Sequence, residues 1–311
     1  MSNKGGAMAN RGFIFDLMDE ISNAPIVHQR LIKKFEEKFN TNLVCYTALF
    51  GHPAGAITYQ DSELIENILR SIELKDKNDN LDLLLHTPGG SPEAAADVIR
   101  VCRSYSKRFR VIVPNAAMSA GTLIAMGSDE IVMSDTSNLG PIDPQMIFVQ
   151  SKDVVIMRPA KSFIDAYIDL INNARALIAS KQPATPFLHL LDRQDPSWII
   201  ECVRARNATE NLAKEQLKVN MLKDKNEAEI AEVVKKFFEV GDKNTHGRSI
   251  SPDEAKAFGL NIKKEDKYGE FWNMIWEIYV RIENYTRNKR LAKYLLSRNG
   301  GIDVQAMPMG I

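Results

Sequence analysis

The chain has 311 residues, of which 40 are basic and 40 are acidic, so its formal net charge is zero. A neutral chain gives no electrostatic reason to expect nucleic acid or an anionic membrane as a partner. Its 44% hydrophobic and 26% charged residues are typical of a globular protein, and no apolar run approaches the length that spans a bilayer.

The first 80 residues begin with a small, polar tail and then show regular hydrophobic patterns. Asp61 and Ser62 stand directly before one periodic stretch, which predicts a capped helix there. The predicted elements are a helix over 13–39, a strand over 43–49 and a helix over 63–72.

From residue 81, short apolar strands alternate with helical patterns. The strands are 81–85, 109–113 and 130–133, and the helices are 92–105 and 119–126. Near-continuous apolar strands that alternate with helices are typical of a parallel sheet buried on both faces, so we expect an α/β fold.

After residue 144 the pattern becomes mostly helical. It predicts a β-hairpin over 146–157, long helices over 160–240 with breaks near 182–186 and 195–196, a short helix over 252–258, and a C-terminal helix over 271–296. That last helix carries apolar side chains over much of its girth, so we expect it to contribute to a subunit interface.

Two small-residue turns carry the chemistry. HTPGG at 86–90 and AMSAGT at 117–122 each follow a predicted strand and open a predicted helix. Ligands bind at the carboxyl ends of parallel strands, and a serine at a helix start has free backbone N–H groups beside it. Such donors stabilise an oxyanion by about 3 kcal/mol each. Each turn alone is commonly structural, but one strand–helix unit apart they indicate a catalytic site.

These turns, together with LGPIDPQ at 139–145, closely resemble the serine dehydrogenase proteinase family over about residues 80 to 146. That family shares a superfold with signal peptide peptidase A, the Clp protease and the crotonases. The resemblance implies a superhelix of ββα units with a helical C-terminal extension, usually assembled into trimers, hexamers or larger rings. It implies that Ser119 is the nucleophile and that Gly90 and Ala120 supply the oxyanion-hole N–H groups, with Gly89 beside them in the same turn.

The general base is left open between two residues. The Clp protease places its histidine about one helix after the nucleophile, and TSNLGPIDPQ has none there. Lys161 opens a helix and resembles the lysine of the Ser–Lys dyads in signal peptide peptidases; a desolvated lysine can deprotonate a serine. His246 precedes a short helix in a pattern similar to one of the serine dehydrogenase proteinase family, and histidine has a suitable pKa.

Other candidate residues are assigned structural roles. His86 follows an apolar strand and is expected to orient the glycine turn through a backbone hydrogen bond, and Asp143 lies in a rigid turn between prolines. The sequence has no HExxH, CxxC or Asp-rich loop, no GxGxxG after a strand and no pyridoxal-phosphate lysine motif. We therefore expect no metal and no cofactor.

The three cysteines, Cys45, Cys102 and Cys202, show no paired spacing, and the first two lie in apolar segments as reduced core residues do. Because no signal-peptide pattern is found either, we expect a cytoplasmic protein without an integral membrane segment. The expected parts are an N-terminal tail and helix (1–40), a Clp/crotonase-like serine protease domain (41–265) and a helical C-terminal extension for oligomerisation (266–311).

Three functions remain in view. The first is a serine endopeptidase that acts on peptides or unfolded proteins through an acyl-enzyme on Ser119. The second is a crotonase-like acyl-CoA enzyme, which the serine in the AMSAG turn disfavours. The third is a pseudo-protease that serves as a scaffold, which the missing Clp-type histidine favours. Labelling with a fluorophosphonate separates the first from the others.

Overall fold

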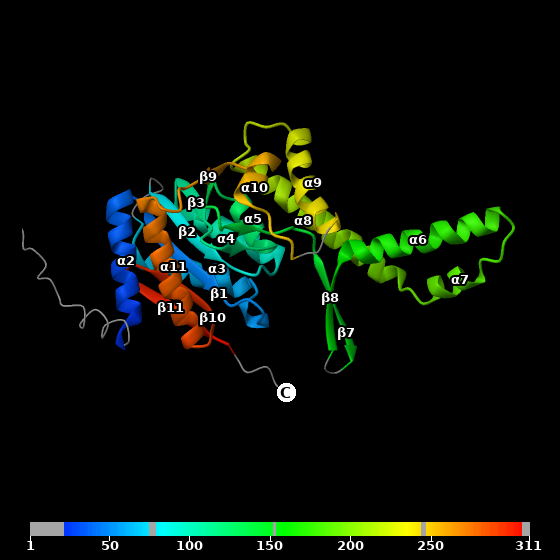
Figure 1. Cartoon of the computed structure of the whole chain (residues 1–311), viewed down its shortest axis with the longest axis horizontal. Coiled ribbons are helices and arrows are strands. Elements are labelled where there is room, and N and C mark those ends of the chain that lie inside the picture. The colour runs from blue at the N-terminus through cyan, green and yellow to red at the C-terminus, as the bar shows by residue number, and fades with distance from the viewer. Residues whose placement is uncertain (1–21, 75–78, 152–153, 244–246, 307–311) are drawn as a thin grey trace, which may run out of the picture.

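The computed structural model describes residues 22–74, 79–151, 154–243 and 247–306 (Figure 1). Its main sheet is built from seven strands of these residues: β1 (Asn42–Ala48), β2 (Asn80–His86), β3 (Arg108–Ile112), β5 (Glu130–Met133), β9 (Ile262–Lys264), β10 (Leu291–Ser297) and β11 (Gly300–Gln305). They lie in the order β11-β10-β1-β2-β3-β5-β9.

The strands β1, β2, β3 and β5 are parallel, as the alternating pattern predicted, and β9, which was not predicted, continues the parallel sheet beside β5. β10 joins the other side of β1 in antiparallel orientation, and β11 continues the sheet from β10. The carboxyl ends of the parallel strands therefore meet at one edge, which is where both small-residue turns follow their strands.

Helices cover both faces of this sheet (Figure 1). Val44 and Tyr46 of β1 pack with α3 (Tyr59–Ser71), α4 (Pro92–Tyr105) and α5 (Ala120–Met126). The alternate residues Leu43 and Cys45 pack on the other face with α2 (Ala24–Phe39) and α11 (Glu270–Asn288). Because each strand buries both faces, its sequence is a continuous apolar run rather than an alternating one.

The C-terminal segment differs from its prediction. The helix expected over 271–296 ends at Asn288, Arg290 takes a left-handed φ of 54°, and Leu291–Ser297 is the fully buried strand β10. The expectation of a helical extension is therefore wrong for residues 291–305. A short apolar run that is buried on all sides has no periodicity to distinguish strand from helix.

The apolar side chains of α11 are largely covered within the chain. Trp272, Ile275 and Ile282 are buried against α2 and the sheet, whereas Trp276 and Val280 stay exposed. α11 thus packs on the face opposite to the helices of 160–240, because α2 and β10 offer the apolar partners.

The start of α3 also differs from its prediction. The helix begins at Tyr59, and the carboxylate of Asp61 accepts a hydrogen bond from the Thr58 N–H at 2.7 Å, as the third residue of a capping box does. Asp61 is buried and forms an ion pair with Lys293 of β10 at 2.6 Å. This pair ties the C-terminal strand to the start of α3.

A hairpin and a helical arm extend from the sheet domain (Figure 1). The hairpin consists of β7 (Gln145–Ser151) and β8 (Val154–Pro159), and the arm consists of α6 (Ala160–Ala179), α7 (Thr185–Asp192) and the first part of α8 (Pro196–Val219). The end of α8, α9 (Glu227–Lys243) and α10 (Pro252–Phe258) pack into the core beside α3, α4 and α5. These elements follow the predicted pattern, except that the break between α8 and α9 was not predicted. Of α6 only Ala160 and Ala174 are buried, and α7 has no buried residue. None of the helices in the described part of the chain combines the length and apolarity required to cross a membrane.

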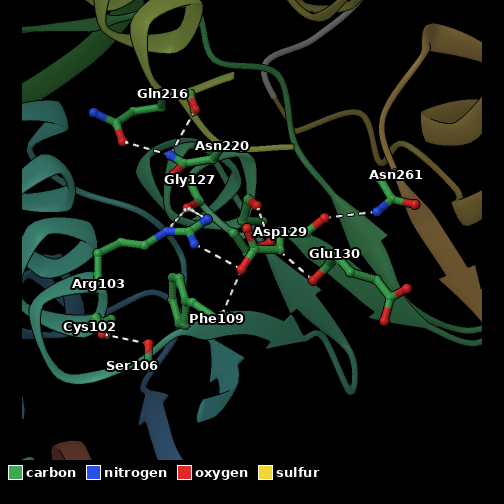
Figure 2. A network of polar contacts seen from close by, with 12 residues as sticks. Cys102, Arg103, Ser106, Phe109, Gly127, Asp129, Glu130, Gln216, Asn220 and Asn261 are labelled. Carbon is green, nitrogen blue, oxygen red and sulfur yellow. Dashed lines mark hydrogen bonds and ion pairs between the residues drawn. The ribbon is translucent and has the colours of Figure 1, made fainter. Parts of the chain in front are cut away.

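A polar network anchors the C-terminal end of α5 (Figure 2). The Arg103 guanidinium of α4 donates to the Gly127 carbonyl at 2.9 and 3.1 Å and to Asp129 at 2.8 Å. Asp129 in turn accepts from the Phe109 N–H at 2.8 Å, at the start of β3. α5 is therefore anchored to α4 and β3, which holds the helix that follows Ser119 in place.

Candidate active site

Ser119 occupies a sharp turn between a short strand and α5. The strand β4 (Ala116–Ala117) pairs in parallel with β6 (Asn138–Leu139), and Ser119 is the residue before the helix. Its backbone angles, φ 52° and ψ −114°, are rare for a residue other than glycine and cost of order 1–3 kcal/mol. A strained strand–turn–helix junction of this kind presents a serine hydroxyl at the edge of a sheet.

The glycine turn after β2 lies directly against this serine. A Cβ atom at Gly89 would stand 2.8 Å from the Ser119 Cβ and 3.2 Å from the Ala120 nitrogen, and its φ is +103°. Only glycine meets both conditions. The two turns singled out in the sequence are thus brought together in space.

Gly90 is oriented by Ile57. The Ile57 N–H donates to the Gly89 carbonyl at 2.7 Å, and the Ser91 N–H donates to the Ile57 carbonyl at 3.0 Å. Backbone groups alternate in direction along an extended segment, so the N–H of Gly90 points away from Ile57. A Cβ at Gly90 would stand 2.2 Å from the Ile57 nitrogen, so this close approach requires glycine.

Two backbone donors remain open beside Ser119. In the first turn of α5, the Gly121 N–H donates to the Met118 carbonyl at 2.8 Å and the Thr122 N–H to the Ser119 carbonyl at 2.9 Å. The N–H groups of Ala120 and Gly90 have no acceptor among the described residues. Free donors on either side of a serine are what an oxyanion requires.

The segment after β5 supports the elbow from behind. A Cβ at Gly140 would stand 3.1 Å from both the Ser119 nitrogen and the Met118 Cα. The neighbouring Leu139 pairs with Ile250 through hydrogen bonds of 2.8 and 3.0 Å. The chain that reaches Ile250 from residue 247 is therefore attached next to the serine turn.

Of the two candidate bases, Lys161 lies within the described residues and His246 lies outside them. Lys161 is the second residue of α6, and its ammonium donates to both carboxylate oxygens of Asp165 at 2.7 Å. These are its only hydrogen bonds within the described ranges, and its side chain is one-third exposed. The Ser119 hydroxyl makes no hydrogen bond to any side chain that the structure describes.

His86 is buried between Phe50 and Tyr279, with ring centroids 4.7 and 5.1 Å away. Burial lowers the pKa of its imidazole to about 4, although the Glu283 carboxylate and the nearby Ala116 backbone act in the opposite direction. The imidazole is thus neutral near pH 7. Its Nδ1 has no hydrogen-bond partner among the described residues. The neighbouring Thr87 N–H instead donates to the Ala116 carbonyl at 3.0 Å, which links the strand before the glycine turn to the strand before Ser119.

The remaining predicted features lie as follows. Asp143 is buried and accepts a hydrogen bond from the Gln145 side chain at 3.1 Å, which fits a turn residue. The three cysteines are buried and unpaired. No cluster of three or more His, Cys, Asp or Glu side chains that could hold a metal occurs in the searched, described part of the chain.

Sequence reasoning missed Ile57 and Gly140, which hold the two turns. Ile57 lies outside the motifs recognised in the sequence. Gly140 lies within the LGPIDPQ block, so its place there was a signal that the segment approaches the elbow, but its contact with Ser119 arises only from the fold.

Comparison with known proteins identifies the family. The protein MJ0137 of Methanocaldococcus jannaschii, which is uncharacterized, is 30% identical over 268 residues, or 84% of this chain and 79% of that protein. The uncharacterized MJ1495 of the same organism is 38% identical over 111 residues, or 36% of this chain and 34% of that protein.

Among solved structures, a mutant of the 1510-N membrane-bound stomatin-specific protease aligns at 18% identity with a TM-score of 0.38, over 70% of this chain and 79% of that chain. The model of one protein family matches residues 20–169, which include both turns and Ser119. The chain belongs to the ClpP-like, SDH-type serine proteinases and has their ClpP-like α/β fold.

Proposed function

We propose that this protein is a serine endopeptidase with Ser119 as its nucleophile. The observation that carries the proposal is the strained Ser119 between two open backbone donors, the N–H groups of Gly90 and Ala120. The Ser119 oxygen attacks the substrate carbonyl while a base accepts its proton, and the two N–H groups bind the oxyanion. The base then protonates the leaving amine, and water hydrolyses the acyl-enzyme.

For the base we favour His246 over Lys161. A lysine acts as a base only when desolvation or a cationic neighbour depresses its pKa. Lys161 is instead about one-third exposed, and its ammonium donates to the Asp165 carboxylate rather than to Ser119. His246 precedes Ile250 by four residues, and Ile250 is hydrogen-bonded to Leu139 beside the serine turn. Four residues of chain span at most about 14 Å, and this short separation from Ile250 supports the choice of His246.

As substrates we propose peptides or unfolded proteins. Membership of a serine proteinase family supports peptide-bond hydrolysis. The crotonase-like alternative is disfavoured because crotonases use a similar oxyanion hole without a nucleophilic serine. In this chain a serine occupies the strained position beside the two donors. We also propose a cytoplasmic location, supported by three unpaired, buried cysteines.

We propose that the protein forms a homo-oligomer. The helical arm of residues 160–203 supports this more strongly than α11 does, because its apolar side chains lack a core of their own. Its exposed apolar residues are Ile168, Ile178, Leu188, Leu190, Ile200 and Val203. Size-exclusion chromatography with light scattering tests this: a trimer or larger ring is expected, and a 35.0 kDa monomer at micromolar concentration contradicts it.

The proposed activity is tested by incubating the protein with unfolded, carboxymethylated protein substrates and identifying the products by mass spectrometry. Ser119→Ala is expected to abolish cleavage, and His246→Gln to lower it by about 10² or more, as removal of a general base does. If Lys161→Met rather than His246→Gln has that effect, the base is Lys161. A folded wild-type protein that cleaves nothing supports the pseudo-protease.

A further inference from the structure

A fully buried hydroxyl lies one helical turn after the nucleophile. Thr122 is completely inaccessible to solvent. Its Oγ1 lies 2.9 Å from the Ala117 carbonyl and 3.0 Å from the Gly140 carbonyl, and it accepts a hydrogen bond from the Gly140 N–H at 3.0 Å. A hydroxyl has one proton, which the two carbonyls share, and the Gly140 N–H donates to one of its two lone pairs.

The groups that Thr122 contacts bracket Ser119. Ala117 is the last residue of β4, two positions before the nucleophile, and Gly140 approaches the Ser119 nitrogen from the other side. Thr122 itself belongs to α5, whose far end is anchored by Arg103. The strand, the supporting segment and the helix around the strained residue are therefore joined at one oxygen atom.

We propose that Thr122 is a positioning residue that holds Ser119 in its strained conformation. This inference rests on the proposed function of Ser119 as nucleophile. A residue with φ 52° and ψ −114° relaxes unless its surroundings over-determine it. The Thr122 hydroxyl supplies this constraint by fixing both the strand that enters the turn and the Gly140 backbone that supports it.

The hydroxyl is required, rather than the volume of the side chain. Valine has nearly the same shape but leaves the buried N–H and carbonyl of Gly140 without their partner. Buried backbone groups without a hydrogen bond are strongly disfavoured, so the segment moves toward another partner and away from the elbow. Serine keeps the oxygen and loses only a methyl group.

The test measures the rate at which Ser119 reacts with a fluorescent fluorophosphonate. In this reaction the serine oxygen bonds to phosphorus, fluoride leaves, and the hydroxyl proton passes to the base. Thr122→Val is expected to slow the reaction by about 10²-fold, the scale of a misplaced reacting atom. Thr122→Ser is expected to restore the rate to within about threefold of the wild type.

Ser128→Ala is the matched control. Ser128 is also fully buried, and its Oγ lies 2.7 and 3.0 Å from the carbonyl oxygens of Ala125 and Glu130, which share its proton, at the opposite end of α5. Its loss removes a comparable hydrogen bond far from the elbow, so the labelling rate is expected to stay near that of the wild type.

The outcomes are distinguishable from failure of the proposed function. Molecules that stay unfolded lower the labelled fraction but not the rate constant. Where unfolding is reversible, the rate constant is divided by the folded fraction measured by circular dichroism, so a poorly folding Thr122→Val still gives a usable rate. Equal rates for Thr122→Val and wild type overturn the proposal, as do a slow Thr122→Ser or an equally slow Ser128→Ala. Wild-type protein that is never labelled instead contradicts the nucleophile itself.

Discussion

Substitution of Gly90 by alanine tests the geometry of the two open donors. The new Cβ would stand 2.2 Å from the nitrogen, 2.4 Å from the oxygen and 2.7 Å from the Cα of Ile57. These atoms are backbone and cannot rotate away as a side chain can. The glycine turn must therefore move off Ile57, and the Gly90 N–H moves with it.

The expected effects on stability and activity are separate. Separation from Ile57 breaks the bonds at 2.7 and 3.0 Å that flank Gly90, at about 1 kcal/mol each. Residual overpacking adds about 1–3 kcal/mol, so the free energy of unfolding falls by about 3–5 kcal/mol. Displacement of one oxyanion donor lowers the reaction rate of Ser119 by about 10²–10³ in the molecules that remain folded.

Urea unfolding followed by circular dichroism measures the first effect, and the rate of fluorophosphonate labelling measures the second. Gly300→Ala is the control, because a Cβ at Gly300 in β11 meets no atom within 4 Å. It is expected to change both quantities little. If Gly90→Ala labels at the wild-type rate while folded, the Gly90 N–H does not bind the oxyanion.

Three further predictions concern stability and assembly. Lys293→Met leaves Asp61 buried and unpaired, and is expected to lower the free energy of unfolding by about 3–5 kcal/mol; adding Asp61→Asn should restore at least half, and no restoration would contradict the pairing. The pKa of His86 is about 4 in the folded protein against about 6.5 in the unfolded chain. The contribution of the neutral imidazole to the free energy of unfolding is therefore complete above pH 6.5, and up to roughly 3 kcal/mol is lost as the pH falls toward 4. Unfolding of His86→Leu should depend less on pH by this amount, and an unchanged pH dependence refutes the prediction. Ile178→Lys on the arm is expected to shift light-scattering mass toward the monomer, whereas an unchanged mass removes the arm from the interface.

The sequence predicted most of the fold because the parallel strands are long apolar runs that alternate with clear helices. Strands β1, β2, β3 and β5 and helices α4, α5 and α10 lie within a residue or two of their predicted bounds. Each of these elements is bounded by glycine, proline or small polar residues, which set the limits of the periodic pattern.

The C-terminal segment could not be predicted in the same way. β10 is buried along its whole length, so its residues show no alternation. Its Leu296 pairs with Cys45 of β1, which lies about 250 residues earlier in the chain. Only the fold reveals that Lys293 completes an ion pair with Asp61. A charged residue in an apolar run reads as solvent-exposed unless its partner is known.

The candidate site was found in part. The turns that contain Gly89, Gly90 and Ser119 were recognised because their small residues follow strands and open helices. The structure adds why glycine is required, since Gly89 would contact Ser119 and Gly90 would contact Ile57 if either carried a Cβ. Such contacts between distant segments leave no mark in a single sequence.

The intact mass of fluorophosphonate-treated protein shows whether Ser119 is an activated nucleophile. We expect one phosphonyl group per chain on wild-type protein, located by peptide mapping to Ser119, and none on Ser119→Ala under the same conditions. A folded wild-type protein that gains no mass, or a Ser119→Ala variant that gains the same mass at the same rate, would contradict it.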